Sequence, residues 1–178
     1  MQANILARRL GVFVKLAEDL GGNLGRTSLM KLCYFLQTLR GVPLKYNFSL
    51  YSYGPFDSEI LSDLQAGESM GVLQAEVEHY PGGYKYDIRP SDKSEKVKEI
   101  AKDFLAGHKK DIDWVTNVFG KRSAADLELL STILFVEDEE SINDDTKLAE
   151  RVNSVKPHFP VPQIEAQISW LRKSALLK

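Results

Sequence analysis

Cysteine is nearly absent from this 178-residue chain, which contains only Cys33. One cysteine cannot form an intramolecular disulfide, which excludes a disulfide-stapled scaffold and fits a reducing compartment, so we expect a cytoplasmic protein. Long apolar runs are missing as well, and no segment approaches the roughly 18 residues that a membrane span needs. Residues 1–9 place their charges in a helical pattern and lack the apolar stretch of a secretory signal. We therefore expect no membrane partner.

The residue patterns that most enzymes need are also lacking. The three histidines, His79, His108 and His158, are scattered, and no His-x-x-x-His or Cys-x-x-Cys spacing occurs, so the sequence predicts no metal site. Cys33 lies in an apolar segment, where a thiol serves packing. There is no Gly-x-Ser-x-Gly nucleophile motif and no phosphate-binding loop. We expect no catalytic residues and no cofactor, and hence a protein that is not an enzyme.

Charge is unevenly distributed, although the net charge is only −2. Residues 1–56 sum to +5 and the remainder to −7. Such an asymmetry marks either a surface that faces a partner or two halves that attract one another when packed. A homo-oligomer, in which the basic end of one copy meets the acidic end of another, is a third interpretation. The pattern leaves the oligomeric state open.

Hydrophobic spacing predicts two helices at the beginning of the chain. Residues 4–20 have helical periodicity and are followed by Gly21-Gly22, which ends the helix. The second helix is expected to begin at Thr27, whose hydroxyl can cap the first turn, and to end at Gly41. It is apolar on nearly every side, so we expect it to lie at the centre of the domain.

An aromatic segment and a third helix follow. Residues 46–53 alternate with period two and predict a strand, which Gly54-Pro55 is expected to end. Asp57 is placed to cap a helix over Ser58–Met70. Beyond this helix, two alternating segments joined by Pro81-Gly82-Gly83 predict a β-hairpin.

The second half of the chain, from residue 91, is expected to be helical. Ser123 and Asp126 resemble a capping box that opens one of these helices. The acidic run Glu137–Glu140 is expected to form a solvated surface loop. It lacks the alternating ligands and the glycine of a calcium loop, so no calcium site is expected there. The expected helices lie near residues 97–105, 112–119, 127–134, 145–154 and 162–173.

These patterns predict an α+β, mainly α fold: a compact helical domain with a winged-helix-like β-hairpin and a C-terminal helical extension. We expect a single domain over residues 1–178. Within it, residues 1–90 would form a winged-helix-like half and residues 91–178 a helical half.

A winged-helix DNA-binding transcriptional regulator is one interpretation, because the third helix would then enter the DNA groove and the hairpin would be the wing. Charge opposes it, since duplex DNA carries one phosphate per ~1.7 Å and repels carboxylates. The carboxylates in question are Asp57, Glu59, Asp63 and Glu68 at the third helix and Glu76 and Glu78 on the hairpin. Nucleic acid is therefore the second choice of partner. Its binding face would consist of Arg8, Arg9, Lys15, Arg26 and Lys31.

Several short motifs resemble the signature of a known family. They are a Lys-Leu-x-Tyr-Phe helix, a Gly-x-Pro-Leu turn, an aromatic strand with Tyr-Gly-Pro, a later helix and a Lys-Pro-x-Phe element. In this chain they occupy residues 29–37, 41–44, 51–56, 127–133 and 155–159. Their order and spacing resemble the Panacea domain family, which includes SocA-like antitoxins and YwgA-like bacterial proteins. The long hairpin and the acidic third helix are more similar to the YwgA-like branch.

The resemblance implies a helical domain that acts by binding proteins. Its best understood members neutralise a toxin or present it for proteolysis. We therefore expect a non-enzymatic protein-interaction module, antitoxin-like or adaptor-like, with a protein partner such as a toxin or a protease.

The aromatic strand and the third helix supply the expected contact surface. Partly exposed aromatic side chains beside the helix would act as interface anchors, although packing alone also uses such residues. The expected partner-binding residues are Tyr51, Tyr53, Phe56, Asp57, Glu59 and Asp63.

Overall fold

The computed structural model describes residues 2–22, 24–81 and 83–177. This part of the chain is mainly helical with a small β-hairpin, as the sequence predicts, and it contains a second two-stranded antiparallel sheet as well. The helices are α1 (Gln2–Leu20), α2 (Arg26–Arg40), α3 (Ser58–Ser69), α4 (Ser94–Ile100), α5 (Lys102–Gly107), α6 (Lys109–Phe119), α7 (Ala124–Glu140), α8 (Asp145–Val155) and α9 (Val161–Lys173). The strands are β1 (Ser49–Tyr51), β2 (Gly54–Phe56), β3 (Leu73–Tyr80) and β4 (Gly83–Pro90).

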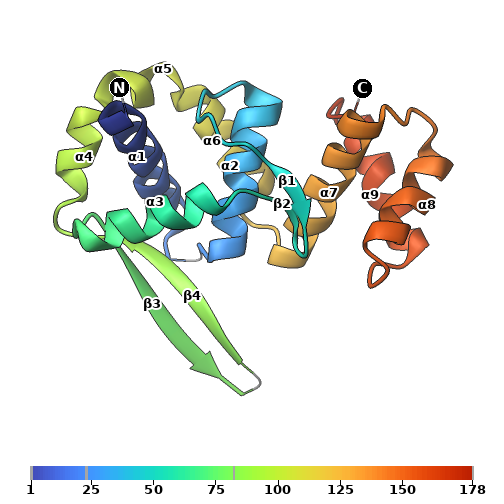
Figure 1. Ribbon diagram of the computed structural model, residues 1–178, viewed down its shortest axis with the longest axis horizontal. Helices are drawn as coiled ribbons and strands as arrows, with labels where there is room; N and C mark the ends of the chain where they lie inside the picture. The colour runs from blue at the N-terminus through green and yellow to red at the C-terminus, as the bar shows by residue number, and fades with distance from the viewer. Residues whose placement is uncertain (1, 23, 82, 178) are drawn as a thin grey trace.

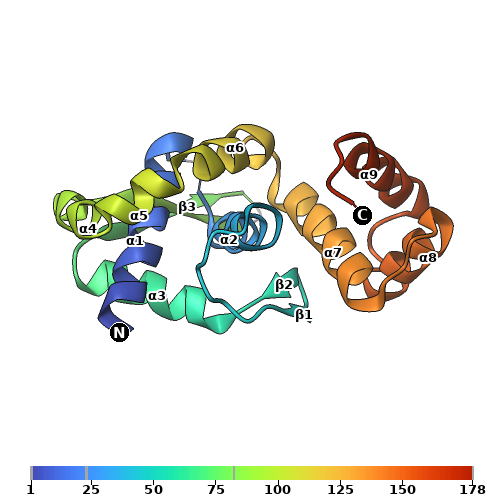
Figure 2. The ribbon, with the colours of Figure 1, turned by 90° about the horizontal axis from the view of Figure 1, so that it is seen from above.

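Helix α2 lies at the centre of the molecule, as its apolar composition predicts (Figure 2). Every side chain from Leu29 to Leu36 is buried, and the helix packs on α6, α7 and β2. Gly41 ends it in the left-handed conformation, with φ 65°. The predicted cap at Thr27 is wrong. The helix begins one residue earlier, and Gly25 occupies the N-cap position, where it has no side chain to accept a hydrogen bond.

The strand predicted over residues 46–53 is instead a short hairpin. β1 and β2 pair antiparallel, with Tyr51 opposite Gly54, so Gly54 and Pro55 begin a strand and do not end one. Gly54 has φ +84°, a conformation that glycine adopts without steric cost. Pro55 is tolerated because both strands are edge strands.

Helix α3 begins where the sequence predicts, and the Asp57 carboxylate accepts a hydrogen bond from the Glu59 amide. The β3–β4 hairpin that follows projects from the body of the molecule (Figure 1). Its base is buried at Leu73 and Ile88, while Tyr84 near the far end is 57% exposed. The predicted turn includes Gly82, which lies outside the described residues, as does the side chain of Glu78.

The amphipathic helix predicted over residues 97–105 is divided at Ala101. Ala101 has φ −91° and ψ 5°, which separates α4 from α5 and leaves Ile100 71% exposed rather than on the apolar face. Helix α1 packs closely at this point, because a Cβ atom on Gly11 would lie 2.8 Å from the Ala101 Cβ. Val97 and Ala101 are buried against α1, as the periodicity predicts.

The acidic loop predicted at Glu137–Glu140 is wrong, because α7 continues through these residues and ends at Ser141. Carboxylates are unfavourable near the negative end of a helix dipole. The negative charge of Glu140 is offset by an ion pair with Arg151 of α8, at 2.8 Å. Helix α7 opens as predicted, with the Ser123 hydroxyl accepting a hydrogen bond from the Asp126 amide.

The boundary predicted at residue 90 does not separate two bodies in space. Helices α4, α5 and α6 cover α1 and α2, whereas α7, α8 and α9 form a lobe on the other side of α2 (Figure 2). One cluster of buried apolar side chains extends through both parts, from Leu10 to Leu171 and beyond. Across residues 2–22, 24–81 and 83–177, no helix is both long and apolar enough to span a bilayer.

Replacing Ser141 with glycine is expected to raise the free energy of unfolding by about 0.5–1 kcal/mol, because Ser141 holds φ 53° at the end of α7 without the freedom of glycine. Urea unfolding measures the change. The matched control is Ser169→Gly on the exposed side of α9, which should lower the same free energy by about 0.5 kcal/mol. Equal effects of the two changes would contradict the left-handed conformation of Ser141 at the end of α7.

Candidate functional site

The β1–β2 hairpin carries the two most exposed aromatic rings among the residues that the structure describes. Tyr51 is 64% exposed and Tyr53 is 67% exposed. Phe56, the third expected anchor, is partly buried, and its ring centroid lies 5.4 Å from that of Tyr51. Two tyrosines therefore face solvent, and the phenylalanine packs against the ring of Tyr51.

Two lysines and a glutamate hold this hairpin, and we refer to Lys31, Glu128 and Lys156 as the hairpin clamp. Lys31 of α2 is 1% exposed and donates a hydrogen bond of 2.6 Å to the Pro55 carbonyl oxygen. Lys156, which follows α8, donates to the carbonyl oxygens of Tyr51, at 2.9 Å, and of Ser52. The Glu128 carboxylate of α7 lies 3.3 Å from the Lys156 ammonium group.

The hairpin also rests directly on α7, beside which it lies in Figure 1. A Cβ atom on Gly54 would lie 2.8 Å from the Thr132 hydroxyl oxygen and 3.3 Å from the Glu128 carbonyl oxygen. The Thr132 hydroxyl donates its hydrogen bond to that same carbonyl, at 2.8 Å. Only glycine therefore allows β2 to approach α7 this closely.

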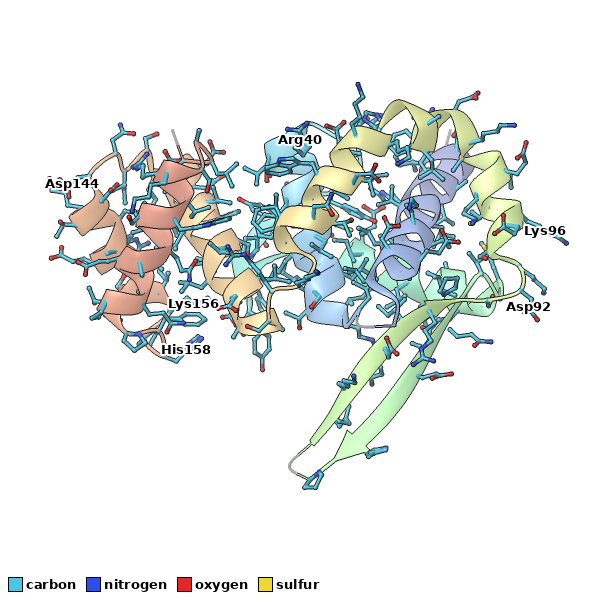
Figure 3. All side chains as sticks on the ribbon, turned by 180° about the vertical axis from the view of Figure 1, so that it is seen from behind. Arg40, Asp92, Lys96, Asp144, Lys156 and His158 are labelled. Atoms are coloured by element: carbon cyan, nitrogen blue, oxygen red, sulfur yellow. The ribbon has the colours of Figure 1, made fainter. Side chains whose placement is uncertain are left out.

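The clamp brings together four segments that are far apart in the sequence. Lys31 belongs to residues 29–37, Gly54 and Pro55 to residues 51–56, Glu128 and Thr132 to residues 127–133, and Lys156 to residues 155–159. These are four of the five motifs that resemble the Panacea signature. Figure 3 labels Lys156 and His158 near one another at one end of the C-terminal helices.

Sequence reasoning missed Glu128 and Lys156, because a charged residue is normally assigned to the surface. Each is buried, with 5% and 3% of its surface exposed. One feature of the sequence could have identified them. Each is a single charged residue in a motif that is otherwise apolar or is followed by proline. Such a charge needs a partner of opposite sign if the motif packs inside the protein.

Burial changes the pKa of one member of the clamp, Lys31. Desolvation lowers the pKa of Lys31 to about 7, Glu128 opposes this shift, and the neighbouring charge of Lys156 adds to it. The Glu128 carboxylate itself lies 3.3 Å from the Lys156 ammonium group and 3.4 Å from the His158 ring. Both lysines already donate to main-chain carbonyls, so the arrangement fixes the position of a backbone segment.

Two predicted surface residues form an internal ion pair instead. Arg9, which is 3% exposed, lies 2.8 Å from the Glu59 carboxylate and 3.2 Å from that of Asp63. Asp63 is 7% exposed and also accepts a hydrogen bond from the Tyr46 hydroxyl, at 2.8 Å. Desolvation raises the pKa of Asp63, while the bonds from Tyr46 and Arg9 oppose the shift. The assignment of Asp63 to a partner-binding surface is therefore wrong.

The five cations proposed as a nucleic-acid face do not form one. Arg9 and Lys31 are buried and engaged, as described above. Lys15 pairs with Asp19 in its own helix, Arg8 lies over the Phe104 ring at 5.3 Å, and Arg26 lies over the Tyr86 ring at 3.7 Å. The prediction failed because arginine and lysine stems pack well on apolar surface, which the sequence pattern does not reveal.

The remaining expected partner-binding residues lie at the start of α3. Asp57 caps the helix and also accepts a hydrogen bond of 2.6 Å from the Asn47 amide, so its carboxylate is occupied locally. Glu59 keeps about half of its side chain exposed, at 53%, beside Arg9. The outward side of α3 includes Leu61, which is 37% exposed, and α3 contains no lysine or arginine.

Other reactive groups are either enclosed or dispersed. Cys33 is fully buried, and desolvation raises the pKa of its thiol. His79 lies on β3, His108 between α5 and α6, and His158 after α8. Within the described part of the chain, no group of three or more histidine, cysteine, aspartate or glutamate side chains could hold a metal ion.

The Gly54→Ala change is expected to lower the free energy of unfolding by about 2–4 kcal/mol, because it combines a strained φ with a clash against α7. Gly21→Ala is the matched control, since Gly21 has φ +59° but nothing within 4 Å of an added Cβ. It should cost about 1 kcal/mol. Urea unfolding of both variants measures the difference, and equal losses would show that β2 does not press on α7.

The Lys31→Met change is expected to remove a pH dependence of stability. The pKa of Lys31 is about 7 in the folded protein and 10.5 ordinarily, so the unfolded chain binds an extra proton between these values. The free energy of unfolding of the wild type should therefore rise with pH in this window. Relative to Lys31→Met it should gain about 1–3 kcal/mol between about pH 6 and about pH 9.

Urea unfolding at both pH values checks this expectation. Burial also raises the pKa values of Cys33 and Tyr46, but both proteins contain these groups, so the difference between the two proteins isolates Lys31. If the free energy of unfolding changes with pH equally in the wild type and in Lys31→Met, Lys31 keeps its ordinary pKa inside the protein.

Comparison with models of known protein families finds no match. Comparison with curated proteins finds no similar sequence. The resemblance to the Panacea domain family therefore stays a prediction from the short motifs, four of which meet at the hairpin clamp.

Proposed function

We propose that this protein is a non-enzymatic protein-interaction module, antitoxin-like or adaptor-like, that binds a protein partner through the β1–β2 hairpin. The observation that carries the proposal is the pair of exposed tyrosines, Tyr51 and Tyr53, on a backbone that buried lysines hold in place. Tyrosine is enriched among the residues that dominate binding energy, because its large ring is rigid and has a polar end.

The hairpin clamp holds the two tyrosines on a backbone that is ordered before binding. An isolated two-stranded hairpin is marginally stable in water, and this one has only three residues in each strand. Bonds from Lys31 and Lys156 to its carbonyl oxygens fix the backbone before any partner arrives. Less conformational entropy is then lost on binding, which favours affinity.

The resemblance to the Panacea domain family supports the same proposal, because its best understood members act on a toxin or bring it to a protease. We extend this to the present chain as a proposed partner class, a toxin or a protease in the cytoplasm. The motifs behind the resemblance are largely the ones that build the hairpin clamp.

A winged-helix DNA-binding regulator is the second candidate. It is favoured by α3 followed directly by the projecting β3–β4 hairpin, which together have the arrangement of a recognition helix and a wing (Figure 1). Charge weighs against it. Although Asp63 is buried, Glu59 and Glu68 remain on α3, and no cation of that helix is present to meet a phosphate.

The double change Tyr51→Ala and Tyr53→Ala is expected to weaken binding of the native protein partner by more than about 10-fold, because both anchors are lost. The partner is identified by co-purification from the native host, and its affinity is measured by calorimetry. Tyr84→Ala on the β3–β4 hairpin is the matched control, since Tyr84 is also exposed, at 57%, but belongs to another surface.

Unchanged affinity of the double variant would remove the hairpin from the interface. A protein that always purifies alone, together with a salt-sensitive complex on DNA upstream of its own gene, would overturn the proposal and favour the regulator.

A further inference from the structure

A groove beside the hairpin is lined by Arg26, whose buried Nε has no hydrogen-bond acceptor. Two adjoining hollows share Arg26 and Leu61, and we refer to them together as the α2–α3 groove. The first encloses about 130 Å³ and is largely apolar, with Met30, Phe56 and Leu61 in its wall. The second encloses about 330 Å³ and includes Glu68.

Arg26 differs from the other stacked arginine of this region. Arg9 lies over the Tyr46 ring at 4.0 Å and bonds to two carboxylates and two carbonyl oxygens. Arg26 lies over the Tyr86 ring at 3.7 Å, and its Nε is the only buried side-chain nitrogen without a hydrogen-bond partner in the described part of the chain. Stacking fixes the guanidinium plane but satisfies none of its N–H donors.

We propose that the α2–α3 groove binds a segment of the protein partner in which an aliphatic side chain neighbours an aspartate or glutamate. The aliphatic side chain would enter the apolar hollow, and the carboxylate would pair with Arg26. This inference rests on the proposed function and names the chemistry of the partner.

The dimensions and the charges of the groove both favour such a segment. A volume of 130 Å³ is about four times the share of one water molecule in the liquid, which suits one medium-sized apolar side chain. A planar guanidinium pairs with a carboxylate through two parallel hydrogen bonds, and its stacking on Tyr86 restricts its orientation beforehand. Glu68 in the second hollow disfavours an extended polyanion such as a nucleic acid.

The groove is continuous with the interface proposed above. Tyr53 and Phe56 belong to the hairpin and also line the apolar hollow, while Leu61 reaches it from α3. A partner that covers Tyr53 therefore lies next to Arg26. One polypeptide can occupy both surfaces, with the tyrosines as its outer contacts and the groove as its inner one.

A random linear peptide library displayed on phage and selected on the full chain tests the inference. The expected survivors contain an aspartate or glutamate close to a leucine, isoleucine or methionine. Fluorescence anisotropy of a labelled survivor should show about 10-fold weaker binding to Arg26→Gln, and a similar loss when the peptide's acid is made an amide. The two changes together should lose little more than either alone, since they remove the same contact.

Arg8→Gln is the matched control, because Arg8 also lies over a ring, that of Phe104, but on the side of α1. It should bind the peptide like the wild type. Arg26→Lys keeps the charge and loses the paired donors, so its affinity should fall between those of the wild type and Arg26→Gln. Thermal unfolding of every variant checks that the fold is retained.

Survivors without an acidic residue, or survivors that bind Arg26→Gln as tightly as the wild type, would overturn the inference. So would independent, additive losses from the protein and peptide changes. A native partner that is lost with the tyrosine double variant but retained by Arg26→Gln would refute the groove while leaving the proposed function in place. Retention by both variants would instead refute the hairpin interface.

Discussion

The pairing of one buried carboxylate, that of Glu128, is the interaction on which the candidate site depends. A buried charge is costly unless a charge of opposite sign lies beside it. Lys156 supplies that charge at 3.3 Å, and the same ammonium group reaches the main chain of β1. Lys31, whose charged form Glu128 stabilises, reaches the main chain of β2. The electrostatic requirement of one side chain thereby determines where an eight-residue aromatic hairpin lies.

This arrangement also connects the first part of the chain to the lobe formed by α7, α8 and α9. The hairpin belongs to the first part of the chain, Glu128 and Lys156 to the second, and Lys31 to the central helix between them. Removing one member of a buried pair leaves the other uncompensated, which is more destabilising than the loss of a surface ion pair. The exposed tyrosines are therefore connected energetically to α7 and to the end of α8. The neighbouring groove, in contrast, is built from α2, α3 and the hairpin alone.

Periodicity and local caps were sufficient to predict most of the fold. The burial of Leu29–Leu36, the cap at Asp57 and the β3–β4 hairpin all follow from patterns within about ten residues, and the structure confirms each one. The exposure of Tyr51 and Tyr53 was likewise anticipated. Two of the failures involve a partner that is distant in sequence. Asp63 is buried because Arg9 lies 54 positions away, and no local pattern contains that information. The separation of α4 from α5 similarly coincides with close packing by α1.

The hydrogen bond from Lys156 to Tyr51 joins residues 105 positions apart, and this separation has a consequence during synthesis on the ribosome. Domains fold as the chain emerges, at roughly 5–20 residues per second, so several seconds pass between the appearance of these two residues. Throughout that interval the hairpin lacks the hydrogen bonds from Lys156 to its carbonyl oxygens. A nascent chain therefore acquires its ordered tyrosine pair only after Lys156 has left the ribosome.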